Sequence, residues 1–147
     1  MILLTRELAD IMSDPDHLHD LVRARLLLEP QLAALAAAKA TPAEKDALLR
    51  MVDRMEQETD RFGLMTQGHA FHMALAAASH NVVLNGFYQS AASQLRSMRV
   101  LESLTLEIYR QGVEDHRQIA RAVAASDSSG AMEAMASHLA KDYAEYL

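Results

Sequence analysis

The sequence has 147 residues, 50% of them hydrophobic, and a chain of this length can bury about 70% of its unfolded surface in one domain without a disulfide or a metal. It contains no cysteine, which excludes disulfides, a cysteine nucleophile and thiolate zinc sites, so any metal must be held by nitrogen and oxygen atoms. Twenty acidic and fourteen basic residues give a net charge of −6, which disfavours direct binding to a nucleic-acid backbone.

The first predicted elements are a short helix and two long ones. The short helix covers about residues 1–12 and ends before Pro15, since a proline disfavours helical geometry in the residue before it. Apolar residues at three- and four-residue steps predict a long helix over about 16–40. Thr41, with a proline after it and a glutamate three residues later, forms a capping box that begins a second long helix over about 42–61.

The second half of the chain continues in the same pattern. We expect Gly63 to separate the helix over about 42–61 from a following helix over about 64–79, and His80 and Asn81 to end that following helix. A break is expected between residues 101 and 106. Four further helices are predicted in this half, over about 64–79, 82–100, 106–125 and 129–146.

The composition agrees with this helical reading. Three Phe, four Tyr, five Gly and three Pro, against abundant Ala, Leu and Met, favour helix over sheet. Short connections between helices are typical of an antiparallel bundle. No apolar run approaches the roughly 20 residues of a membrane span, and the start of the chain does not fit a signal peptide. We therefore predict an all-α antiparallel bundle of six or seven helices, in the cytoplasm and with no membrane partner.

Arg25 lies on the apolar stripe of the first long helix, so its guanidinium should face the interior of the bundle. A buried arginine needs an anion or several carbonyl groups, because an unpaired buried charge costs several kcal/mol. A structural ion pair with Glu29 or with another helix is the commoner explanation. The alternative is a clamp for the carboxylate of a ligand, which the planar guanidinium can bind through two parallel hydrogen bonds.

Three histidines occupy inward-facing stripes on three different predicted helices. A single histidine in such a position is more often a hydrogen-bonded core residue than a metal ligand. Neutral imidazoles that converge at the centre of a bundle would suit zinc or nickel. Their spacing forms no local motif, so both readings stay open for His72, His116 and His138.

Three segments together resemble the FCD domain, the effector-binding half of FadR-type regulators in the GntR family. The segments are residues 25–30 with 35–37, residues 71–81, and residues 115–139. The similarity covers roughly residues 16–140. It implies a helical bundle that dimerises and binds a small organic acid, often beside a divalent metal ion.

The resemblance also implies which residues form the site. In metal-binding members, an aspartate one helical turn before the first histidine joins three histidines, and an arginine of the first long helix holds the effector carboxylate. The arginine is Arg25, and Asn81 is a second candidate for effector binding. The aspartate position is Gly68 here, which removes one ligand and one negative charge. The metal ligands implied by motif are His72, His116 and His138.

The change at Gly68 leaves three outcomes open. Water or an effector oxygen could fill the vacant ligand position, or His69 could swing in from the adjacent position. The metal could also be lost, in which case Arg25 would do most of the anion binding. If an ion is kept, zinc or nickel is favoured over magnesium because imidazole suits them. A second departure is His80, which replaces the glycine usual before Asn81, although asparagine tolerates the left-handed conformation of such a turn.

The expected function is effector sensing and dimerisation in a GntR/FadR-type transcriptional regulator, and not an enzymatic activity. Residues 1–15 would form a short helix or linker, and residues 16–147 the FCD-like ligand-binding domain. Fifteen residues leave no room for a winged helix-turn-helix, so we expect DNA binding only through a domain absent from this chain. Two alternatives are a metal-dependent hydrolase-like bundle and a ligand-free oligomerisation module. The latter predicts a dry, closely packed interior around the histidines.

Overall fold

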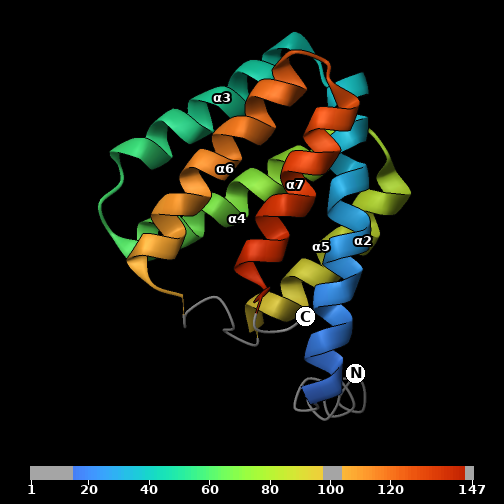
Figure 1. Ribbon diagram of the computed structural model, residues 1–147. Helices are drawn as coiled ribbons and strands as arrows, with labels where there is room; N and C mark the ends of the chain where they lie inside the picture. Colours follow the sequence, from blue (N-terminus) through green and yellow to red (C-terminus); the bar gives the residue numbers. More distant parts are fainter. Residues whose placement is uncertain (1–14, 98–103, 145–147) are drawn as a thin grey trace.

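The computed structural model describes residues 15–97 and 104–144, and within these ranges all regular secondary structure is helical (Figure 1). This confirms the predicted all-α fold. The predicted short helix over residues 1–12, and the predicted end of a helix near residue 100, lie outside the described residues. The helices are α2 (Pro15–Lys39), α3 (Pro42–Gln57), α4 (Arg61–Ala78), α5 (Val82–Ser97), α6 (Leu106–Ala124) and α7 (Ser128–Asp142).

The start of α3 is as predicted, whereas the boundary between α3 and α4 is not. Thr41 caps α3 with both hydrogen bonds of the capping box. The helix ends at Gln57, earlier than expected, and α4 begins at once after Asp60. The side chain of Asp60 accepts a hydrogen bond from the backbone N–H of Gly63, which places this glycine inside the first turn of α4. The prediction that Gly63 separates two helices is therefore wrong.

The later helix ends also have identifiable causes. The backbone of His80 has a φ of 50°, so this histidine adopts the left-handed conformation that glycine adopts most readily at the end of a helix. Asn81 instead caps α5, because its side chain accepts a hydrogen bond from the N–H of Leu84 at 3.0 Å. The last helix ends at Asp142 rather than at residue 146, since Tyr143 has left helical geometry.

The helices pack so that four of them contact α2. α2 lies beside α7 and also contacts α4, α5 and α6, while α6 contacts both α7 and α3 (Figure 1). The core between them is formed by fully buried side chains such as Val22, Phe71, Ile119 and Met135. Each such side chain stabilises the fold by about 1.5–3 kcal/mol. No helix in the described part of the chain is long and apolar enough to cross a bilayer.

Candidate metal and effector site

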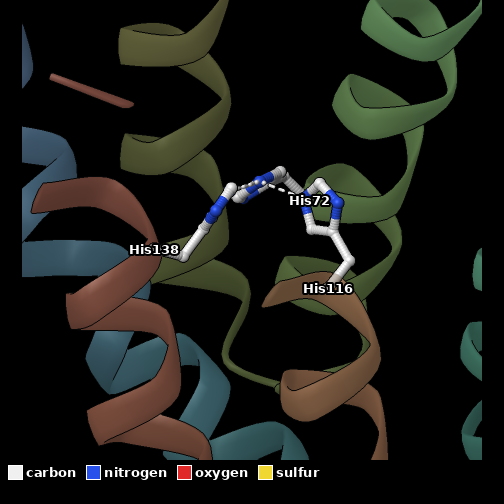
Figure 2. A group of neighbouring side chains, drawn as sticks. All are labelled: His72, His116 and His138. Atoms are coloured by element: carbon white, nitrogen blue, oxygen red, sulfur yellow. Dashed lines mark hydrogen bonds between the residues drawn. The ribbon is translucent and has the colours of Figure 1, made fainter. Parts of the chain in front are cut away.

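Three histidines from three helices point toward one another at the centre of the bundle, as Figure 2 shows. His72 comes from α4, His116 from α6 and His138 from α7, and none is more than 7% exposed. Each lies on the buried face of its helix, one turn from core residues, so the apolar periodicity of the helix carries the imidazole inward. The structure thus brings together the three residues that the sequence singled out.

The facing atoms are the Nε2 nitrogens. Nε2 of His72 lies 3.0 Å from Nε2 of His116 and 3.2 Å from Nε2 of His138. One nitrogen from each of the three rings lies within 4.8 Å of the other two. Nitrogens at this separation, on a buried and convergent set of rings, are the donors that a zinc or nickel ion requires.

The outer nitrogens of two rings contact carboxylates. Nδ1 of His72 lies 2.5 Å from Oε2 of Glu29, and Nδ1 of His138 lies 3.4 Å from Oδ2 of Asp115. A carboxylate can only accept, so each Nδ1 carries the proton and donates it. In the neutral ring this leaves a lone pair on Nε2, and the two lone pairs face each other. Carboxylates that orient histidines in this way are the usual outer partners of metal ligands.

Electrostatics hold two of the rings in the neutral form that binds metals. Burial lowers the pKa of His72, with only part of the effect offset by the nearby Glu29 carboxylate. Burial lowers the pKa of His116 well below its ordinary value, and the neighbouring histidines lower it further. Nδ1 of His116 is buried and has no hydrogen-bond partner among the described residues. These rings therefore need no deprotonation step before they could bind an ion.

Arg25 lies next to the three histidines, on the face of α2 that is turned toward the interior of the bundle. Its Nε donates a hydrogen bond to Glu29, one helical turn later, and its Nη1 donates to the hydroxyl of Tyr143. The ring of Tyr88 lies 5.8 Å from the guanidinium carbon, within the range of a cation–π contact. Burial by itself would raise the pKa of Glu29, but Arg25 and His72 lower it to about 2. The structural ion pair with Glu29 that the sequence suggested is present.

Some site residues were missed by sequence reasoning. Asp115 is not among the site residues predicted from the sequence, yet it is buried, and it also accepts a hydrogen bond from Lys141 at 2.7 Å. The hydroxyl of Tyr88 is buried without a hydrogen-bond partner in the described part of the chain, and burial raises its pKa. Burial likewise raises the pKa of Tyr143 to about 12. The position of Asp115, three residues after the buried Gly112, is the one sequence feature that could have indicated its inward direction. No sequence pattern indicates that the two tyrosines lie at the site.

The remaining sequence candidates occupy different places. A Cβ atom built on Gly68 would lie 3.5 Å from Cε1 of His116, so position 68 does face the histidines. Within the described residues, the group of side chains that could hold an ion comprises the three histidines and does not include His69. The side chain of Asn81 is engaged in capping α5, and its role in effector binding stays a prediction.

Comparison with known proteins identifies the family. The sequence model of the FCD domain matches residues 20–141. The chain belongs to the FCD domain family. It is 32% identical over 130 residues to an L-lactate dehydrogenase operon regulatory protein of Escherichia coli (strain K12), covering 86% of this chain and 50% of that protein. It is also 32% identical over 137 residues to the HTH-type transcriptional regulator LutR of Bacillus subtilis (strain 168), covering 89% of this chain and 63% of LutR.

A solved structure agrees with this assignment. The FCD domain described here superposes on Streptococcus agalactiae GntR with a TM-score of 0.75 and 26% sequence identity, over 88% of this chain and 59% of that one. The chain spans about half the length of the E. coli relative. The family predicted from the sequence is confirmed, and the relatives are named as regulators, in agreement with a regulatory rather than an enzymatic domain.

Proposed function

We propose that this FCD domain senses a small organic acid on behalf of a GntR-type transcriptional regulator. The observation that carries the proposal is the convergence of three buried histidine nitrogens beside a buried arginine, with Glu29 in contact with both. Such a constellation offers a cation site and an anion site next to each other. A carboxylate ligand could use both at once.

The cation would be held by His72, His116 and His138. Their donor set favours zinc or nickel over magnesium, because imidazole nitrogen suits the former ions. Two of the rings are already oriented by hydrogen bonds to carboxylates, which reduces the cost of ordering them on binding. A bound ion would supply a Lewis-acidic centre for an effector oxygen.

The effector carboxylate would be held by Arg25. A guanidinium has five N–H donors, and two of them contact Glu29 and Tyr143. We propose that other N–H groups of the guanidinium meet the anion, and that the hydroxyl of Tyr88, whose ring lies 5.8 Å from the guanidinium carbon, adds a further donor. We take L-lactate as the first candidate because one relative is named for an L-lactate dehydrogenase operon. Other small hydroxy, keto and sugar acids share the same chemistry.

The regulatory consequence follows from differential affinity. An effector that binds one arrangement of α2 against α4, α6 and α7 more tightly shifts the protein toward that arrangement, whereas one that binds both equally shifts nothing. We propose that the domain forms a homodimer in the cytoplasm and that DNA is bound by a different domain of the regulator. The net charge of −6 supports this division, because it disfavours contact with a phosphate backbone.

Calorimetry tests the effector site. L-Lactate, pyruvate and sugar acids would be titrated into wild-type protein and into Arg25→Ala, with Arg117→Ala as the matched control. The side chain of Arg117 pairs with Asp53 and Glu56 of α3, so its loss removes an equal charge and none of the contacts described for the histidines or for Arg25. Binding by wild type and Arg117→Ala, but not by Arg25→Ala, supports the proposal. Equal binding by all three removes Arg25 from the site.

The same experiment separates the proposal from the ligand-free oligomerisation module. That alternative predicts close packing around the histidines, and the ring centroids do lie between 4.5 and 5.2 Å apart. A module without a ligand binds none of these acids and no divalent ion. Saturable binding of either kind would count against it.

A further inference from the structure

The FCD domain described here has glycine at position 68, where the sequence resemblance implies a carboxylate ligand, yet three other carboxylates contact its histidines. Glu29, Asp115 and Asp142 each contact one imidazole. They differ in which ring nitrogen they touch. That difference decides which of them could replace the missing ligand.

Glu29 and Asp115 contact the outer nitrogens, and Asp142 contacts an inner one. Oδ2 of Asp142 lies 3.4 Å from Nε2 of His138. The same Nε2 lies 3.2 Å from Nε2 of His72, so Asp142 contacts the inner nitrogen of one of the three converging histidines, just outside the group of atoms within 4.8 Å of one another that the histidines form. A carboxylate on an outer nitrogen orients a ligand, whereas one at the inner nitrogens can itself be a ligand.

We propose that Asp142 supplies the carboxylate ligand of the cation site in place of the residue at position 68. This inference rests on the proposed function, because it assumes that the three histidines bind a divalent ion. The acidic ligand would then come from the last turn of α7 instead of from α4. The site would have three imidazoles and one carboxylate, with its negative charge restored.

Two features of the contact between His138 and Asp142 support this role. His138 and Asp142 are one helical turn apart on α7, so their side chains share a face. Since Nδ1 of His138 donates to Asp115, its Nε2 is an acceptor in the neutral ring, and it faces the carboxylate oxygen of Asp142 at 3.4 Å with no hydrogen between the two acceptors. A cation bound to both atoms satisfies them.

The surroundings of Asp142 also favour a bound cation. Its side chain is only 20% exposed, and among the described residues no lysine or arginine forms an ion pair with it. It also lies at the C-terminal end of α7, where the helix dipole disfavours a negative charge. A cation bound at the histidines would offset both costs.

The test measures Zn²⁺ binding by calorimetry after treatment with a chelator, in wild type, Asp142→Asn and Glu133→Gln. Glu133 is an exposed acid on the same helix, so it controls for the loss of one negative charge from α7. We expect Asp142→Asn to weaken Zn²⁺ binding by about tenfold or more, and Glu133→Gln to change it by less than about twofold. The visible absorption of bound Co²⁺ should change in Asp142→Asn and stay the same in Glu133→Gln.

A second variant tests whether the carboxylate has moved from one helix to another. A Cβ atom at position 68 meets only ordinary van der Waals contact, so Gly68→Asp introduces no clash at that atom. Added to Asp142→Asn, it should restore the affinity for Zn²⁺ to within about threefold of wild type. In the wild-type background it should gain less than about threefold, because the carboxylate position is already filled.

The outcomes separate this inference from the function on which it rests. If wild type and Asp142→Asn bind Zn²⁺ equally while His72→Ala does not bind, the cation site stands and the role of Asp142 is wrong. If wild type binds no Zn²⁺, both the cation site and this inference fail. If circular dichroism shows that Asp142→Asn does not fold, the Gly68→Asp variant alone decides the role of Asp142. A gain of about tenfold or more in its affinity for Zn²⁺ would mean that the carboxylate position is vacant in wild type and would overturn the inference.

Discussion

The carboxylate of Glu29 lies 2.5 Å from Nδ1 of His72 through one oxygen, and it accepts a hydrogen bond from Arg25 through the other. One buried side chain therefore contacts both the proposed cation site and the proposed anion clamp. Glu29 compensates the charge of Arg25 and strengthens His72 as a metal ligand at the same time. These two effects have opposite consequences for the two kinds of ligand.

Replacing Glu29 by glutamine should move two affinities in opposite directions. Zn²⁺ binding should weaken by about tenfold or more, because His72 loses its carboxylate partner. L-Lactate binding in the absence of metal should strengthen, because the guanidinium of Arg25 is no longer neutralised. Both affinities are measured by calorimetry on the same preparation, with Glu133→Gln as the control.

A purely structural role for Glu29 makes a different prediction. A variant that only loosens the bundle would weaken both ligands together and would bind lactate less tightly than wild type. That parallel loss would contradict the link between Arg25 and His72.

Metal binding should stabilise the fold through mass action. At a free Zn²⁺ concentration of about 100 times Kd, the free energy of unfolding should rise by about 2.7 kcal/mol. Differential scanning calorimetry with Zn²⁺ and with a chelator would measure this as a higher Tm in wild type. The His138→Ala variant should show no such rise, and an equal rise there would mean that the ion binds elsewhere.

Tyr88 should contribute to effector binding and not to stability. Its hydroxyl is buried without a hydrogen-bond partner among the described residues, and such a group costs about 1–3 kcal/mol. Tyr88→Phe should therefore keep or raise the free energy of urea unfolding while it weakens L-lactate binding. A variant that loses stability but binds lactate normally would show that the hydroxyl serves the fold.

The metal-free domain should lose stability as the pH falls below about 6.5, the value for an unfolded histidine. His116 has its pKa held well below that value by burial, so the unfolded chain takes up its proton first. The stabilising contribution is complete above pH 6.5 and is lost progressively as the pH falls toward the folded pKa. For one proton the slope is at most about 1.4 kcal/mol per pH unit.

Urea unfolding at several pH values checks this expectation. Wild type should lose stability more steeply between pH 7 and pH 5 than His116→Gln, which cannot take up the proton. Nδ1 of His116 has no hydrogen-bond partner in the described part of the chain, so the substitution removes no bond at that atom. Parallel pH profiles would mean that His116 is not held neutral by the fold.

The sequence predicted the parts of this site that depend on helical periodicity. His72, His116 and His138 each lie one turn from buried apolar residues, and a 3.6-residue period is sufficient to place such side chains on an inner face. The capping box at Thr41 was equally predictable, because all its members lie within four residues.

The residues that sequence reasoning missed depend on distances between helices. Tyr143 meets Arg25 across 118 positions of sequence, and no local pattern records that contact. Gly63 shows a different limit, since the Asp60 cap overrode the tendency of glycine to interrupt a helix. Asp142 follows His138 by one helical turn, but only the structure shows that its carboxylate approaches Nε2 of His138.

The most direct test of the account is anomalous diffraction at the zinc edge from crystals grown with Zn²⁺ and L-lactate. The account predicts one strong peak bonded to Nε2 of His72, His116 and His138, with a carboxylate of the ligand at Arg25. Density that shows the three imidazoles in contact with one another, and zinc absent or bound elsewhere, would contradict it.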